Sequence, residues 1–203
     1  MKGLILDTET TGLNSPQVIE LAYLPVDENL KADKDSMYQG LFKPSKSIEP
    51  KALEIHGISM KELEGKPNSS DMKNYAPEVF ADNYIIGHNI DYDIDAIKNS
   101  VGDTDFNIIC TKRLALYAFP NQTSYSLTNL TKALSANEYK NLTQKAHRAD
   151  MDVLMTLGLL EVIAQRIEAQ TGKKQTLDTL YDLSQEIGYI PYEEYSSIIR
   201  SNW

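Results

Sequence analysis

The sequence predicts an α/β fold built around a mixed β-sheet. Short apolar runs that end in acids, threonines or turn residues recur along the chain, as expected of buried strands. Apolar residues also recur at helical spacing, most clearly over residues 148–168, where Val153, Leu157 and Leu160 form one stripe. The length of 203 residues fits one domain, or one domain with an appendage.

The composition excludes several classes of protein. Hydrophobic residues make up 41% of the chain and charged residues 24%, which argues against a disordered or fibrous protein. The net charge of −9 argues against a basic surface that wraps nucleic acid nonspecifically. Cys110 is the only cysteine, so no intramolecular disulfide can form. Because no signal peptide or membrane-length apolar stretch is visible, we expect a cytoplasmic protein with no membrane partner.

The first strands are expected to form an antiparallel meander. Residues 3–7 are apolar and end at an acid, residues 18–26 form a second run, and residues 37–43 form a third that Pro44 stops. Since the three runs follow one another closely, antiparallel pairing is favoured.

The rest of the chain alternates between predicted helices and strands. We expect strands over residues 84–87 and 107–110, and helices over residues 50–56, 60–63, 93–100, 111–119, 126–135, 148–168 and 177–187. A turn over residues 188–191 and a last helical piece to Trp203 follow. We predict a main domain of residues 1–170 and a helical appendage of residues 171–203, whose aromatic content favours contact with a second copy or a partner protein.

Two acids stand at the end of the first strand. Asp7 and Glu9 are two residues apart, so they share a face of the strand and lie about 7 Å apart along the backbone, given a rise of ~3.3 Å per residue. Paired acids repel one another unless a cation lies between them, and a hard divalent ion with oxygen ligands is the usual solution. A strand that simply ends in a polar turn would give the same pattern.

Two further segments carry candidate site residues. Asp91, Asp93 and Asp95 alternate with apolar or aromatic residues at the start of a predicted helix; an EF-hand loop is excluded, and the pattern alone leaves open which acid points inward. His147 and Asp152 lie about 140° apart on a regular helix, so they can converge only if His147 precedes the helix. A solvated surface histidine is the alternative interpretation.

Three segments, in this order, resemble the three exonuclease motifs of the DEDDh 3′–5′ exonuclease family, the proofreading-type enzymes of the ribonuclease H-like superfamily. They are LDTETTGL at residues 6–13, GHNIDYD at residues 87–93 and HRADMD at residues 147–152. Residues 48–58 and 109–115 also look typical of the family. The resemblance covers about residues 1–168, with a motif layout similar to that of exodeoxyribonuclease X, and implies a ribonuclease H-like mixed sheet flanked by helices.

The resemblance implies the roles of individual residues. Four acids match the family's metal ligands, and His147 matches its catalytic base. The family pattern selects Asp93 as the second-motif acid, with Tyr92 where phenylalanine is usual. The implied catalytic residues are Asp7, Glu9, Asp93, His147 and Asp152, of which Asp7, Glu9, Asp93 and Asp152 would bind metal. The implied substrate-binding residues are Thr8, Thr10, Leu13, His56, His88 and Asn89.

The same resemblance implies a reaction. Two Mg²⁺ ions, for which Mn²⁺ would substitute, would activate the attacking water and stabilise the leaving 3′ oxygen, while His147 takes the proton of the water. DNA would be hydrolysed from a free 3′ end to nucleoside 5′-monophosphates. An RNA-trimming enzyme of the oligoribonuclease or RNase T type and an inactive nucleic-acid-binding module are the alternatives, and the 2′-OH decides between DNA and RNA. A polymerase partner and self-association both stay open.

Overall fold

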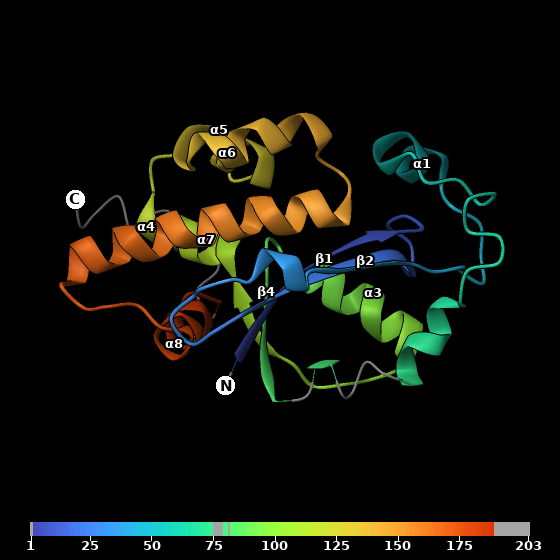
Figure 1. The fold of residues 1–203 in the computed structure, drawn as a ribbon, viewed down its shortest axis with the longest axis horizontal. Helices are drawn as coiled ribbons and strands as arrows, with labels where there is room; N and C mark the ends of the chain where they lie inside the picture. Colours follow the sequence, from blue (N-terminus) through green and yellow to red (C-terminus); the bar gives the residue numbers. More distant parts are fainter. Residues whose placement is uncertain (1, 75–78, 81, 189–203) are drawn as a thin grey trace.

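The computed structural model describes residues 2–74, 79–80 and 82–188 of the chain. One five-stranded sheet with the order β3-β2-β1-β4-β5 lies between two layers of helices (Figure 1). The strands are β1 (Lys2–Thr10), β2 (Val18–Val26), β3 (Tyr38–Leu41), β4 (Asn83–Gly87) and β5 (Asn107–Cys110). The first three pair antiparallel, as predicted, whereas β4 and β5 are parallel to β1. The predicted mixed α/β fold is therefore confirmed.

The helices follow the predicted order closely. They are α1 (Pro50–His56), α3 (Asp91–Val101), α4 (Thr111–Ala118), α5 (Leu127–Leu134), α6 (Asn137–Lys140), α7 (Ala149–Thr171) and α8 (Leu177–Gly188). Among the described residues, the 3₁₀ segments are η1 (Lys34–Ser36), η2 (Ser69–Asn74) and η3 (Asn141–Lys145). Gly172 ends the longest helix, α7, in a left-handed conformation at φ 68°, which glycine adopts without steric cost. None of the helices in this part of the chain has the length and apolar content needed to cross a membrane.

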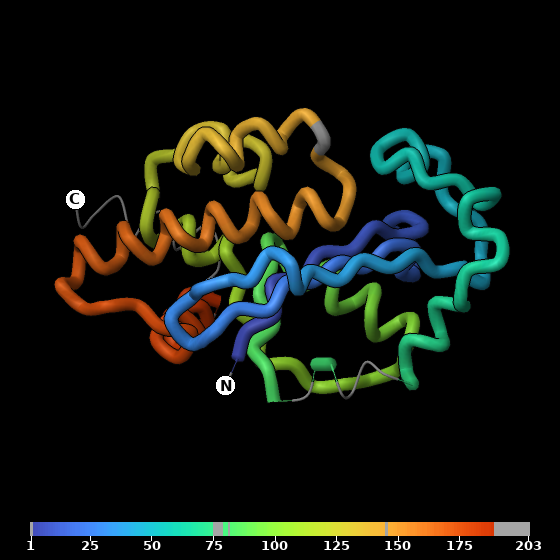
Figure 2. The backbone as a smooth tube through the Cα atoms, in the orientation of Figure 1, coloured from blue at the N-terminus to red at the C-terminus, as the bar shows by residue number. Residues whose placement is uncertain are grey.

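Alternating side chains of β1 divide the core between the two faces of the sheet. Ile5 packs in the cluster that α7 covers, whereas Leu4 and Leu6 pack in the cluster that α3 covers. Figure 2 follows α7 across one side of the strands, with α5 and α6 outside it, and α3 on the other side. The odd-numbered residues of β1 therefore face α7, which determines where Asp7 and Glu9 point.

Helix α8 packs against α4 and the β5 edge of the sheet. Leu177, Leu180 and Ile187 are buried in the same core cluster as α7. The hydroxyl of Ser184 accepts from the backbone N–H of Cys110 at 3.0 Å, and the Gln185 side chain donates to the carbonyl of Ile108 at 2.7 Å. The helix thus satisfies an otherwise open strand edge. The predicted division of the chain at residue 170 stays a prediction.

Two local expectations differ from the structure, and one lies outside it. The third strand covers only Tyr38–Leu41, inside the predicted range. Residues 60–63 form successive turns with bonds from residue i+3 to residue i, because the short segment between Gly57 and Gly65 cannot nucleate an α-helix. The predicted turn at residues 188–191 and the last helical piece to Trp203 extend outside the described residues.

Candidate active site

The site begins where β1 and β2 are distorted. A β-bulge between Glu9 and Thr10 shifts the register of the two strands. Such bulges redirect side chains and are common next to active sites. Asp7 and Glu9 are odd-numbered, so both project on the α7 face, as the two-residue periodicity predicted.

Helix α7 supplies a third acid to the pair on β1. Asp152 lies in the first turn of α7 and is 9% exposed. One carboxylate oxygen from each of Asp7, Glu9 and Asp152 lies within 4.8 Å of the other two. Residues 145 positions apart in sequence therefore meet in a space the size of one cation-binding site.

Burial and mutual repulsion raise the pKa values of these acids. Burial is the largest cause for Asp7, whose pKa lies well above its usual value, with Asp93 and Asp152 adding to the effect. Burial, followed by the charge of Asp152, raises the pKa of Glu9 to about 8. Burial also raises the pKa of Asp152 to about 7, although the backbone N–H of His147 opposes the shift. The fold thus brings buried carboxylates together with only partial compensation of their charge, as a metal site does.

Asp93 approaches the cluster from the opposite helix layer. It lies in the first turn of α3 and is 6% exposed, whereas Asp91 and Asp95 are exposed. The backbone N–H and the hydroxyl of Thr8 both donate to its Oδ1, at 2.9 and 2.7 Å. Burial raises its pKa to about 7 despite these bonds, and its charge raises the pKa of Asp7. Asp93 therefore acts on the cluster electrostatically, with one oxygen already bonded to Thr8.

His147 precedes α7, as the spacing required. Its backbone is left-handed at φ 69°, and its ring is exposed. The backbone N–H of His147 donates to both oxygens of Asp152, at 3.4 and 3.2 Å. The turn thus joins the candidate base to the third carboxylate.

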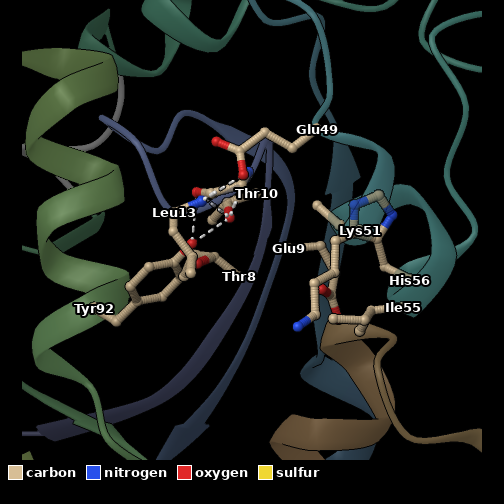
Figure 3. Close-up of a pocket in the computed structure, with 11 residues that line it drawn as sticks. Thr8, Glu9, Thr10, Leu13, Glu49, Lys51, Ile55, His56 and Tyr92 are labelled. Carbon is tan, nitrogen blue, oxygen red and sulfur yellow. Dashed lines mark hydrogen bonds between the residues drawn. The ribbon is translucent and has the colours of Figure 1, made fainter.

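A cavity of about 220 Å³ adjoins the acids (Figure 3). In the close-up, Tyr92, Thr8 and Leu13 lie on one side of the opening, and Lys51, Ile55 and His56 on the other. Glu9 also lines the cavity, so it connects the apolar walls to the carboxylate cluster. Leu13 is 77% exposed at the rim, a position suited to contact with a flat ligand.

A second cavity, of about 370 Å³, shares Ile55 and His56 with the first. His147 and Arg148 line it, together with residues of β3 and the first turn of α7. Burial lowers the pKa of His56, and its Nδ1 accepts from the backbone N–H of Ile58 at 3.0 Å, so the neutral ring carries its proton on Nε2. The two cavities together run from the apolar walls to the exposed histidine.

Hydrogen bonds fix the loop that presents Leu13. Thr10 Oγ1 lies 2.7 Å from the hydroxyl of Tyr92, which donates to the carbonyl of Gly12 at 2.8 Å. The Glu49 carboxylate accepts from the backbone N–H groups of Leu13 and Asn14, at 3.4 and 3.2 Å. Gly12 has φ 136°, and a Cβ there would lie 2.2 Å from the Glu49 side chain. The roles of Glu49 and of the Tyr92 hydroxyl were not predicted from the sequence.

The six residues expected to bind substrate fall into two groups. Thr8, Thr10, Leu13 and His56 line the first cavity, but the hydroxyls of Thr8 and Thr10 are engaged with Asp93 and Tyr92. His88 and Asn89 do not line either cavity. The ring nitrogens of His88 bond to the hydroxyl of Thr111 and the carbonyl of Tyr125, and burial lowers its pKa to about 4. The Asn89 side chain accepts from Lys112 at 3.1 Å. The geometry therefore does not support the expected contact of His88 and Asn89 with the substrate.

The sequence profile of the RNase T family, described as Exonuclease, matches residues 4–160. The chain belongs to this exonuclease family. The match contains every carboxylate of the cluster as well as His147, and the sheet has the ribonuclease H-like arrangement of the family's solved members. The resemblance to DEDDh-type exonucleases that the motifs indicated is confirmed, and the protein is a hydrolytic nuclease.

Individual relatives agree with the family assignment. The exonuclease is 26% identical to the 3′-5′ exonuclease DinG of Staphylococcus aureus strain USA300 over 97% of this chain, but it spans only 22% of the length of that relative. Its structure is similar to that of Exonuclease X in complex with 5′ overhanging duplex DNA, with a TM-score of 0.67, 25% identity and coverage of 89% and 98% of the two chains. Escherichia coli Exonuclease I in complex with a dA16 oligonucleotide has the same fold, with a TM-score of 0.67 and 21% identity, over 89% of this chain and 42% of that one.

The donor atoms of the cluster fit a divalent cation. Asp7, Glu9 and Asp152 offer only carboxylate oxygens, the ligands that hard cations such as Mg²⁺ and Mn²⁺ prefer. Their pKa values are raised because burial and mutual repulsion outweigh the compensation that Arg148 gives Glu9 and the His147 N–H gives Asp152. A bound cation would supply that compensation, and the family is divalent-metal dependent.

Proposed function

We propose that the exonuclease hydrolyses DNA from a free 3′ end with two Mg²⁺ ions and releases nucleoside 5′-monophosphates one at a time. The convergence of Asp7, Glu9 and Asp152 within 4.8 Å is the observation that carries this proposal. Similarity to a 3′-5′ exonuclease and to two exonucleases solved with DNA supports the direction and the substrate.

Each residue of the site has a part in the proposed reaction. Asp7, Glu9 and Asp152 would hold the metal, and Asp93, oriented by Thr8, adds negative charge next to Asp7. The bound ions would lower the pKa of the attacking water and stabilise charge on the leaving 3′ oxygen. His147, exposed beside the second cavity, accepts the proton of the water.

The two cavities provide the binding surface for the substrate. The terminal nucleotide enters the 220 Å³ cavity, where Leu13 and Ile55 offer apolar contact for the base. The scissile phosphate then lies beside Glu9, between this cavity and His147. A net charge of −9 is compatible with binding a phosphate because the ions, rather than side chains, supply the local positive charge.

A single comparison tests the proposal. DNA and RNA oligonucleotides of one sequence, labelled at the 5′ end, are incubated with the wild-type chain in Mg²⁺ or in EDTA, and with Asp7→Asn in Mg²⁺. We expect a ladder that shortens from the 3′ end, with DNA degraded faster than RNA, and only in the wild type with Mg²⁺. Faster degradation of RNA would favour the RNA-trimming alternative. Activity in EDTA or in Asp7→Asn would refute the metal mechanism.

A further inference from the structure

A further acid on the α7 face of the sheet, besides Asp7 and Glu9, does not belong to the carboxylate cluster. Glu20 of β2 pairs directly with Glu9 in the antiparallel register, and its side chain has no solvent exposure. A buried carboxylate is costly unless donors surround it, so filling space in the core does not explain a glutamate at this position.

Nitrogen donors occupy both oxygens of the Glu20 carboxylate. Arg148 donates from Nη2 to Oε1 at 2.7 Å and from Nε to Oε2 at 3.2 Å, which is a two-pronged ion pair. The backbone N–H of Ala149 donates to Oε2 at 3.1 Å, and Gln39 donates to Oε1 at 3.0 Å. Glu20 is thus completely engaged with α7 and β3, with its oxygens directed to these nitrogens.

These bonds fall at the first residues of α7. Ala149 is the first residue of the helix, and Arg148 is its N-cap but makes no side-chain capping bond of its own. Glu20 on strand β2 thus caps α7: its carboxylate accepts one of the N–H groups that the start of a helix leaves without a partner. His147 immediately precedes this anchor, and Asp152 follows it within one turn.

We propose that Glu20 is a positioning residue for hydrolysis: through Arg148 and the Ala149 N–H it fixes the start of α7, and so holds Asp152 and His147 in register with Asp7 and Glu9. This inference rests on the proposed function. In this proposal Glu20 binds neither the metal nor the substrate. Glu20 acts through helix geometry, and a displacement of about 1 Å at a reacting group is enough to cost roughly 10²-fold in rate.

The test uses the full chain with Glu20→Gln, which keeps the size of the side chain but replaces one acceptor by a donor. We expect kcat on a 5′-labelled oligonucleotide to fall by roughly 10- to 10²-fold with KM nearly unchanged, and the affinity for Mn²⁺ without nucleic acid to fall by about 10-fold. Hydrogen exchange of the amides in the first turn of α7 should accelerate. Arg148→Lys keeps the positive charge but loses the pair of hydrogen bonds from the guanidinium to Glu20, so it should show the same effects. This variant provides the test if Glu20→Gln does not fold.

Matched controls lie on the same helix, away from the site. Glu161→Gln removes the charge of a glutamate that accepts from Tyr139, and Arg166→Lys alters an arginine that donates to the carbonyl of Ala118. Both should retain kcat. If Glu20→Gln lowers only the melting temperature, with kcat, Mn²⁺ affinity and first-turn exchange like the wild type, the proposal is overturned. If the wild type degrades no nucleic acid, the proposed function fails, while the exchange measurement still decides whether Glu20 anchors α7.

Discussion

The backbone N–H of His147 donates to the carboxylate of Asp152, so the candidate base and a candidate metal ligand are hydrogen-bonded to each other. They are five positions apart in sequence, and a regular helix would direct them to different sides. The left-handed backbone of His147, at φ 69°, reverses the chain just before α7 and removes that difficulty. This turn lets one short segment supply both groups.

The first prediction separates the imidazole of His147 from its backbone. In His147→Asn the ring is lost, but asparagine tolerates the left-handed conformation better than most residues, so the turn should persist. We expect kcat to fall by roughly 10²- to 10⁴-fold. Melting temperature and Mn²⁺ affinity should stay near those of the wild type, because the ring is exposed and contributes little to packing. Activity close to that of the wild type would rule out His147 as the base.

The second prediction concerns the charge of Asp152. Asp152→Asn should abolish turnover and weaken Mn²⁺ binding, since it removes one of three converging carboxylates. The same change should raise the melting temperature in EDTA, because burial and nearby acids already raise the pKa of Asp152 to about 7. Asp95→Asn, on the exposed side of α3, is the matched control and should leave turnover, Mn²⁺ binding and the melting temperature unchanged. A lower melting temperature for Asp152→Asn in EDTA would contradict the repulsion argument.

The third prediction is a pH dependence of stability in the metal-free protein. Glu9, Asp93 and Asp152 have pKa values of about 8, 7 and 7 in the folded state, above their ordinary values of 4.5, 3.8 and 3.8. Between about pH 4 and pH 8 the folded protein therefore binds more protons at these groups than the unfolded chain, and their contribution to stability falls as pH rises.

Thermal melts in EDTA from pH 5 to pH 8.5 measure this effect. We expect the melting temperature to decrease across the range, and the decrease to be smaller in Glu9→Gln, which lacks one of the titrating groups. Saturating Mn²⁺ should stabilise the protein most at the alkaline end, where the ligands give up their protons most easily. A metal-free melting temperature that rises over this range would be evidence against the raised pKa values.

Periodicity was sufficient to predict the sheet and most helices, because one face of each element is buried and the apolar residues repeat accordingly. The spacing of Asp7 and Glu9 likewise predicted that they share a face. Local patterns do not reveal which distant side chains meet, so the choice of Asp93 came from the family resemblance. The role of Glu20 was not predicted, although it is a single acid within the apolar run of residues 18–26. That role depends on hydrogen bonds from Arg148, 128 positions away. For the same reason the bonds that occupy His88 could not be foreseen.

The last prediction addresses the rim of the 220 Å³ cavity. Leu13 is 77% exposed, and the Glu49 carboxylate and the Tyr92 hydroxyl hold its loop. A contact with the terminal base would be present before and during the reaction, so Leu13→Ala should raise KM and leave kcat nearly unchanged. Glu49→Ala should also raise KM, because it frees the loop that carries Leu13. Leu53→Ala provides the control, since Leu53 is 39% exposed on α1 but does not line the cavity. If Leu13→Ala has the KM of the wild type on both short and long oligonucleotides, Leu13 does not contact the substrate.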